Sequence, residues 1–233
     1  GTVIMAGRSS QFGIPISRAK KAFLLANASK NMFLSGIHCH AASNVTVPEP
    51  LIKIADKILA FNDVLFGMGV RIEFADFGGG FGIPYRSEER EFDFERYVKG
   101  MKEVLGAHEK VGQFYWEPGR VLVGDAGYLL LKVVDIVESW NKTYAITDGG
   151  INCLARPVLL EAQHRIEKIE DDTEKREYVV AGPSCTTIDV LGTIQSNLKT
   201  GDLLVVHNCG AYGLSQSLIH FGSQPIAREI FVD

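Results

Sequence analysis

The stretch Asp76-Phe77-Gly78-Gly79-Gly80-Phe81-Gly82-Ile83-Pro84-Tyr85 decides the fold that we predict for this chain. It follows residues 70–75, whose alternating β-branched and aromatic side chains predict a buried strand that the glycine run ends abruptly. Three successive glycines can adopt positive φ and let a ligand approach bare backbone, so their N–H groups can converge on a phosphate. A flexible strand-to-helix turn explains the same glycines equally well.

Composition narrows the class of protein. The 233 residues can bury a substantial core, in one large domain or two smaller ones. A formal charge of -4, with no basic block longer than Lys20-Lys21, argues against a nucleic-acid partner. No apolar run approaches the roughly 20 residues that span a bilayer, and no signal-peptide pattern opens the sequence, so we expect no membrane association. Four scattered cysteines without a C-x-x-C pair predict free thiols and a cytoplasmic location.

Helices and strands are predicted to alternate through the first half of the chain. Helical spacing of apolar residues predicts helices over residues 15–31, 49–66 and 92–109, and β-rich runs predict strands over residues 33–40, 70–75 and 113–116. Such alternation is typical of βαβ units in a parallel sheet, where ligands bind beyond the carboxyl ends of the strands. The glycine loop, residues 40–43 and residues 117–120 all fall at such ends.

The pattern changes after residue 120. Short β-rich runs separated by turn residues predict a mostly antiparallel β domain, with strands over residues 128–138, 143–147, 176–181, 202–207 and 228–232. A charge run over residues 167–176 predicts a solvated hairpin tip. We therefore expect an α/β domain over residues 1–122 and a β-sandwich or β-barrel-like domain over residues 123–233.

Two motifs in the first half offer ligand chemistry. His38-x-His40 on a strand would put both imidazoles on one face, where they can bind a metal ion. No third ligand stands at a suggestive spacing, and a neutral histidine is equally useful for stacking, so we expect no metal site. In Glu117-Pro118-Gly119-Arg120 the arginine can grip a phosphate and the glutamate can partner a protonated ring nitrogen, although a charged turn without chemistry explains the motif as well.

Two motifs in the second half present reactive side chains from turns. Gly182-Pro183-Ser184-Cys185 places a thiol after a predicted strand, where it is either a buried structural cysteine or a proton donor. Gly210-Ala211-Tyr212-Gly213 presents a phenol that can bind a phosphate or simply pack. Each of these motifs is weak by itself.

Their order along the chain is more specific. The residues 36–43, 76–81, 117–120, 148–157, 182–189 and 210–212 together resemble the fold-type-III pyridoxal-phosphate decarboxylases, and most of all the diaminopimelate decarboxylase branch. The resemblance runs from about residue 12 to the end of the sequence. It implies the incomplete C-terminal part of a (β/α)8 TIM-like barrel followed by a mostly antiparallel β domain.

The resemblance also implies roles for single residues. His40 would stack on the pyridoxal phosphate ring and act in catalysis with Cys185, which would return a proton to the substrate. Glu117 would keep the pyridine nitrogen protonated. In the family this cysteine acts in the active site of the neighbouring subunit, so a homodimer is expected. Further implied contacts are Ser43, Gly78, Gly79, Gly80, Gly119, Arg120 and Tyr212 for the cofactor, and Asp148, Arg156 and Thr186 for the substrate.

Two departures from the family pattern shape the expected function. The Schiff-base lysine of the family belongs to a tyrosine-alanine-x-lysine-alanine-asparagine type of motif that these 233 residues lack, so we expect a C-terminal portion that is inactive alone. Thr186 stands where diamine-forming members carry an acidic residue for a distal ammonium group, which a neutral hydroxyl cannot neutralise. The expected substrate is therefore an amino acid without a distal ammonium group, free or tethered to a carrier protein.

A second hypothesis is a non-catalytic paralogue that binds or regulates a partner. The retention of His40, Glu117, Arg120, Cys185 and Tyr212 favours the enzyme, because a scaffold has no need for all of them.

Overall fold

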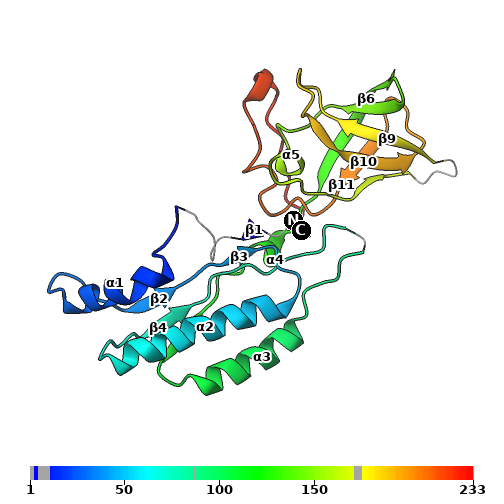
Figure 1. Ribbon diagram of the computed structural model, residues 1–233. Helices are drawn as coiled ribbons and strands as arrows, with labels where there is room; N and C mark the ends of the chain where they lie inside the picture. Colours follow the sequence, from blue (N-terminus) through cyan, green and yellow to red (C-terminus); the bar gives the residue numbers. More distant parts are fainter. Residues whose placement is uncertain (1–2, 5–10, 87, 171–174, 233) are drawn as a thin grey trace. The chain divides into compact units, whose positions relative to one another are not determined.

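The computed structural model describes residues 3–4, 11–86, 88–170 and 175–232, and Figure 1 shows their secondary structure. The chain divides into two compact units. Of the described residues, the αβ unit comprises those up to 83 together with 90–121, and the β unit comprises those between 84 and 89 together with those from 122 onward.

A parallel sheet forms the centre of the αβ unit. In the described part of the chain it has three strands in the order β2-β4-β5, namely β2 (Gly36–His38), β4 (Phe74–Asp76) and β5 (Gln113–Tyr115). The parallel pairing agrees with the sequence prediction. Residues 70–73 were predicted as part of a strand, but β4 begins at Phe74, where pairing with Gly36 of β2 starts. A separate antiparallel pair joins β1 (Val3–Ile4) to β3 (Ala42–Ser43).

The helices lie close to their predicted positions, as α1 (Ile16–Ala28), α2 (Pro48–Gly67) and α3 (Phe94–Ala107). Local chemistry explains where they begin. Pro48 starts α2, where a missing N–H costs nothing, and Glu49 places negative charge at its positive end. Asp93 caps α3 by accepting a hydrogen bond from Arg96 N at 2.9 Å. Figure 1 shows α2 and α3 running side by side along the sheet.

The core of the αβ unit lies between this sheet and the helices. Leu59 and Leu65 on α2 and Ala75 on β4 are fully buried in it. Burial of such side chains supplies most of the stability of a small sheet with few strands. Among the helices in the described ranges, none is long and apolar enough to cross a membrane.

A single curved sheet makes up most of the β unit. Among the described residues it has six strands in the order β10-β9-β7-β6-β11-β8, and every pair is antiparallel except β7 with β9. The end strands β8 and β10 also contact each other, so the sheet curls into a nearly closed barrel. The strands are β6 (Leu129–Ser139), β7 (Lys142–Thr147), β8 (Ile166–Lys168), β9 (Arg176–Ala181), β10 (Val190–Ser196) and β11 (Leu203–Val206).

The β unit corrects three predictions. Strands β8 and β10 were not predicted. The charge run over residues 167–176 is not a hairpin tip, because β8 pairs with β11 whereas β9 pairs with β7 and β10; residues 171–174 lie outside the described residues. Residues 228–232 do not form the predicted strand, and Phe231 there is 95% exposed. The short helices are α4 (Arg120–Val123), α5 (Arg156–Leu160) and the 3-10 turn η1 (Phe221–Ser223).

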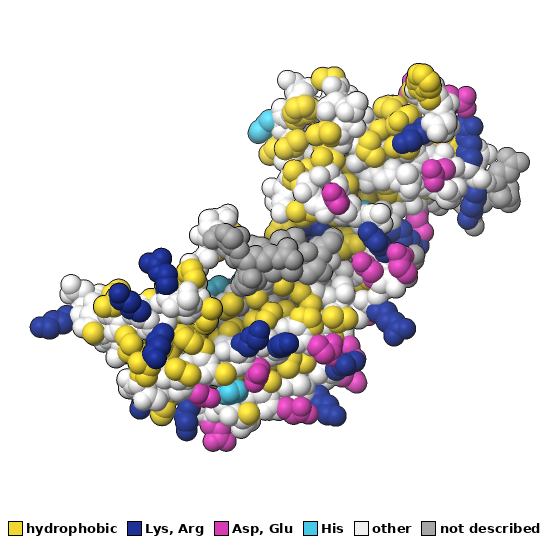
Figure 2. Space-filling model, in the orientation of Figure 1, with side chains coloured by type: hydrophobic (Ala, Val, Ile, Leu, Met, Phe, Trp, Pro, Cys, Tyr) yellow, Lys and Arg dark blue, Asp and Glu magenta, His cyan; other side chains and the backbone are white. Residues whose placement is uncertain are grey.

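Charged side chains are interspersed on the surface. On the face that Figure 2 presents, the αβ unit carries both basic and acidic side chains, and the acidic ones lie mainly along its lower edge. On this face neither sign of charge gathers into a continuous patch.

His108 joins α3 to α2. Its Nδ1 lies 2.6 Å from Asp63 Oδ2, and its Nε2 lies 3.2 Å from Asp56 Oδ1. Burial alone lowers the pKa of His108, but the hydrogen bonds and negative charges of the two carboxylates together outweigh burial and raise this pKa above its usual value. The protonated imidazole therefore stabilises the contact between the two helices.

We predict that this contact makes the stability of the αβ unit depend on pH. Because the pKa is raised in the folded state, the stabilisation is complete below the unfolded-state pKa of about 6.5 and is lost as pH rises through the folded-state value. In urea titrations, the difference in unfolding free energy between the native chain and His108→Gln should shrink as pH rises from about 5.5 to about 8.5. The exposed His220 supplies the control, His220→Gln. A His108→Gln difference that does not vary with pH contradicts the assignment.

Candidate functional site

The candidate site forms where the three parallel strands end side by side. The final residues of β2, β4 and β5 are His38, Asp76 and Tyr115. Beyond the strands the chain stays paired, because Phe77 N donates to Tyr115 O at 3.1 Å and Glu117 N donates to Gly78 O at 2.9 Å. His40, the glycine loop and Glu117 therefore lie at one edge of the sheet.

Close packing explains why the loop consists of glycines. Gly78 and Gly80 have φ of 66° and 106°, a region that favours glycine. A Cβ at Gly78 would lie 2.8 Å from His40 Cβ, and a Cβ at Gly79 would overlap the carbonyl oxygen of Glu117. The glycines are thus required by the approach of neighbouring segments, whether or not a ligand binds.

Two N–H groups of this loop already have protein partners. Gly79 N donates to His40 Nδ1 at 3.1 Å, and Gly78 N donates to Asp76 Oδ1 at 2.9 Å. Since Nδ1 of His40 accepts this bond, the proton of the neutral ring is on Nε2. The bond fixes the imidazole beside the loop, and an anion that bound these two N–H groups would compete with His40 and Asp76 for them.

A second cluster surrounds the Glu117 carboxylate. His38 Nε2 lies 3.4 Å from Glu117 Oε2, and ligand atoms of His38, Asp76 and Glu117 all lie within 4.8 Å of one another. One imidazole and two carboxylates can hold a divalent cation. The sequence analysis did not predict Asp76, the last residue of β4, or Glu117, two residues after β5, as metal ligands, and His40 is not part of this group. A cation here would compete with any ring nitrogen for Glu117.

Three further predicted cofactor contacts lie on β3 and around the start of α4. Ser43, the last residue of β3, is half-buried, and Arg120, the first residue of α4, is only 8% exposed. Gly119 is exposed. Sequence reasoning missed Asn44, whose Oδ1 accepts a hydrogen bond from Ile83 N at 3.2 Å and so ties the segment after β3 to the end of the glycine loop. Its signal is the residue type, because asparagine tolerates the positive φ of 56° found here.

In the β unit, Cys185 differs from the other cysteines by its exposure. All four cysteines lie in the described ranges and none forms a disulfide. Burial raises the pKa of the Cys39, Cys153 and Cys209 thiols, that of Cys209 to about 12. Cys185 is instead presented to solvent, which excludes the buried structural thiol that the sequence left open.

The other predicted residues of the β unit differ in their surroundings. Asp148 is exposed, and its Oδ1 accepts a hydrogen bond from Lys132 N at 2.9 Å. Arg156 is only 2% exposed, and its guanidinium carbon lies 5.1 Å from the centre of the Tyr85 ring. Tyr212 is 46% exposed at a φ of 62°, a strained conformation of the kind that recurs at functional sites.

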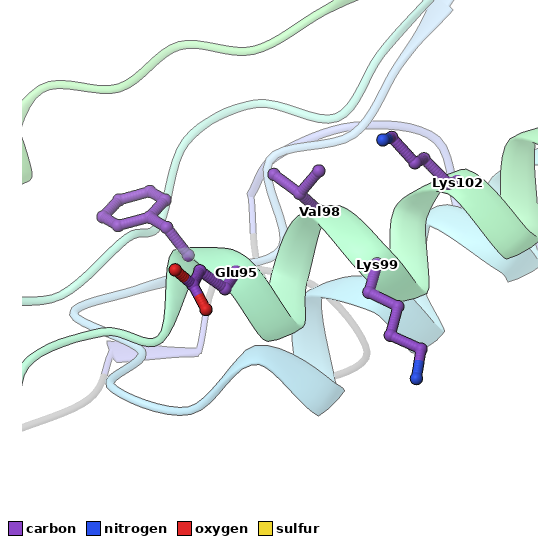
Figure 3. A pocket seen from close by; sticks show the side chains of 5 residues that line it. Glu95, Val98, Lys99 and Lys102 are labelled. Atoms are coloured by element: carbon purple, nitrogen blue, oxygen red, sulfur yellow. The ribbon is translucent and has the colours of Figure 1, made fainter.

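An open depression on α3 has no part in this site. Figure 3 shows the side chains that line it, which all come from one face of α3 and its first turn. They are Phe94, Glu95, Val98, Lys99 and Lys102, around a volume of about 470 Å³. None of them is a predicted site residue, so the edge of the sheet remains the candidate site in the αβ unit.

A family model and curated relatives both match most of this chain. The model of the family described as "Pyridoxal-dependent decarboxylase, C-terminal sheet domain" matches residues 23–210. Diaminopimelate decarboxylase of Vibrio cholerae is 36% identical over 228 residues, which are 97% of this chain and 54% of that protein. Diaminopimelate decarboxylase of Methanothermobacter thermautotrophicus is 32% identical over 98% of this chain and 55% of its own length. The chain thus spans about half the length of the curated relatives it matches.

Solved structures show the same similarity. Diaminopimelate decarboxylase from Helicobacter pylori, complexed with L-lysine, matches 96% of this chain with a TM-score of 0.86 at 27% identity, over 56% of that chain. The enzyme from M. jannaschii, in co-complex with L-lysine, matches 94% of this chain with a TM-score of 0.86 at 31% identity, over 52% of that chain.

We predict that the glycine loop tolerates no side chain at position 79. Because a Cβ there would overlap Glu117 O, Gly79→Ala should lower the unfolding free energy by about 1–3 kcal/mol. Gly106 is the matched control, since nothing lies within 4 Å of a Cβ at this helical position. Gly106→Ala should stabilise the chain by about 0.5–1 kcal/mol. Urea denaturation measures both, and equal effects of the two substitutions would refute the packing argument.

Proposed function

Because this chain belongs to the pyridoxal-dependent decarboxylase family, we propose that it is the C-terminal portion of an enzyme that releases CO2 from an amino acid. The observation that supports this best is the meeting of His40, the Gly78–Gly80 loop and Glu117 at the ends of β2, β4 and β5. The family is pyridoxal-dependent, which confirms the predicted cofactor, pyridoxal phosphate.

The residues at this edge fit such a cofactor in shape and charge. The glycine loop carries no side chains, so a phosphate can come close to its backbone, where it would replace Asp76 and His40 as the acceptor for the N–H groups of Gly78 and Gly79. Arg120 supplies a permanent positive charge, and Ser43 supplies a hydroxyl donor. We propose that Gly78, Gly79, Gly80, Ser43, Gly119, Arg120 and Tyr212 hold the phosphate end, with His40 against the ring.

Protein side chains would do the remaining work. When bound, pyridoxal phosphate supplies an electron sink for the electron pair that stays on carbon as CO2 leaves. The Glu117 carboxylate would accept a hydrogen bond from the ring nitrogen and keep it protonated. The imidazole of His40, held by Gly79 N, would fix the ring plane. Cys185 Sγ would deliver a proton to the carbon that has lost CO2.

Thr186 carries our proposal for the substrate. It stands directly after Cys185, and its Oγ1 lies within the loop, where Ile188 N donates to it at 3.5 Å. A hydroxyl cannot neutralise a distal ammonium group. We propose a substrate without a distal ammonium group, either a free amino acid or one tethered to a carrier protein, with Asp148 and Arg156 among its contacts.

Diaminopimelate is the second candidate substrate. It is favoured by the names of the relatives that are 31–36% identical to this chain. Its two ends both carry an ammonium and a carboxylate group, so it would need a counter-charge from residues other than Thr186.

Assembly is also part of the proposal. We propose that the lysine that binds the cofactor lies outside these 233 residues, that residues 1–122 belong to a (β/α)8 barrel and residues 123–233 to a separate domain, and that two copies pair so that Cys185 serves the neighbouring subunit. We also propose a cytoplasmic location, consistent with four free thiols.

The main test is CO2 release by the intact protein with pyridoxal phosphate. Glu117→Gln should lower kcat about 100-fold or more, because a neutral amide cannot hold the ring nitrogen protonated. Cys185→Ser should lower kcat about 10²–10⁴-fold, because the proton donor is weakened. Glu138→Gln, an exposed carboxylate on β6, is the control and should leave kcat unchanged. An intact protein that binds pyridoxal phosphate but releases no CO2 from any amino acid, free or tethered to a carrier protein, supports the non-catalytic paralogue instead.

A second test concerns the substrate. If Thr186 sets the preference, Thr186→Glu should raise kcat/KM for diaminopimelate about 10–100-fold relative to amino acids without a distal ammonium group, the value of one charged hydrogen bond. Thr187→Glu, one residue further along an exposed stretch, is the control. Efficient turnover of diaminopimelate by the unaltered protein would reject the Thr186 argument and leave the decarboxylase proposal intact.

A further inference from the structure

The loop that carries Cys185 is held by a carboxylate four residues further along the chain. Asp189 is only 2% exposed. Its Oδ2 accepts a hydrogen bond from Ser184 N at 2.9 Å, and its own backbone oxygen accepts one from Gly182 N at 3.0 Å. These two bonds hold the loop at its first residue, Gly182, and at Ser184, the residue before Cys185.

The same carboxylate reaches a second segment. Asp189 Oδ1 accepts a hydrogen bond from Ile151 N at 2.7 Å, across 38 positions of sequence. Ile151 lies in the turn that connects β7 with Arg156 at the start of α5. A single buried side chain therefore bridges the loop of the proposed proton donor and the turn that leads to a proposed substrate contact.

The Asp189 carboxylate fits between the two segments only because glycines face it. A Cβ at Gly150 or at Gly182 would overlap the Asp189 carboxylate, and a Cβ at Gly150 would also lie 2.6 Å from the Cα of Gly182. Thr147 adds a parallel link, since its Oγ1 lies 2.7 Å from Gly149 O and 3.0 Å from Ala181 O. The two segments touch through bare backbone, and only an acceptor at Asp189 can satisfy the N–H groups that face each other there.

We propose that Asp189 is a positioning residue, whose buried carboxylate fixes the Cys185 loop against the Gly149–Asn152 turn and so sets where the thiol is presented. The consequence for catalysis rests on the proposed decarboxylase function, whereas the structural link does not. The position of the Cys185 thiol matters because, in general acid catalysis, a donor must lie within hydrogen-bond reach of the atom it protonates.

Amide hydrogen exchange and thiol alkylation test the link in the intact protein without any need for activity. In the unaltered protein, the N–H groups of Ser184 and Ile151 should be protected although both lie outside helices and strands. In Asp189→Asn, which keeps the shape but turns one acceptor into a donor, both amides should exchange at least about tenfold faster, and the iodoacetamide rate at Cys185 should change by about threefold or more.

Asp202→Asn is the matched control. Asp202 is another buried carboxylate of the β unit, where it accepts from Lys199 N at 2.9 Å and lies 3.1 Å from Lys168 Nζ, away from the Cys185 loop. It should destabilise the unit without a selective effect at Ser184, Ile151 or Cys185. Fast exchange of Ser184 and Ile151 in the unaltered protein, or equal effects of the two variants, overturns the proposal.

Activity distinguishes this inference from the proposed function. Asp189→Asn should lower kcat about tenfold with KM changed by less than about twofold, the pattern of a displaced proton donor. Selective exchange effects in a protein without decarboxylase activity would reject the proposed function and keep the structural link. Normal kcat in Asp189→Asn would reject the positioning role.

Discussion

Contact between bare backbone segments is the constraint on which the αβ unit depends. The absence of side chains at Gly78, Gly79 and Gly80 lets the chain after β4 lie against His40 on one side and against the carbonyl of Glu117 on the other. Hydrogen bonds then follow from proximity, from Gly79 N to His40 and from Glu117 N to Gly78 O. One loop thereby sets the distance between an imidazole and a carboxylate that are 77 residues apart in sequence.

Local sequence patterns predicted the two long helices well and the ends of the strands poorly. Apolar spacing predicted α2 and α3 to within two residues at each end, because one face of each helix is buried. Strand ends depend on the partner, so residues 70–73 remain outside β4 although Val70 and Ile72 are buried. The apolar run at residues 228–232 has strand composition, yet composition alone supplies no neighbour to pair with.

The unpredicted strands have their own physical reasons. β8 lies in a charged stretch, and only its pairing with β11 makes it a strand. β10 contains Gly192 at a φ of 154°, within a register shift between Val190 and Gly192, so the strict alternation that sequence reasoning seeks is broken there. Both strands depend on pairing over a long sequence separation, which no local window contains.

Some residues of the candidate site could be predicted from the sequence and others could not. The order of motifs predicted which stretches carry chemistry, because glycines, His40, Glu117 and Cys185 stand out by residue type. The supporting residues Asn44, His38 and Asp189 act through partners 38 to 79 positions away, and these partners are what the sequence did not reveal. In each unit a carboxylate accepts N–H groups of a glycine-containing turn, Asp76 from Gly78 and Asp189 from Ile151 and Ser184. Such acceptors settle the backbone before any ligand arrives, which lowers the ordering cost that binding must otherwise meet. In both the cofactor loop and the Cys185 loop, a buried or half-buried carboxylate therefore accepts the backbone N–H groups that water would otherwise bind.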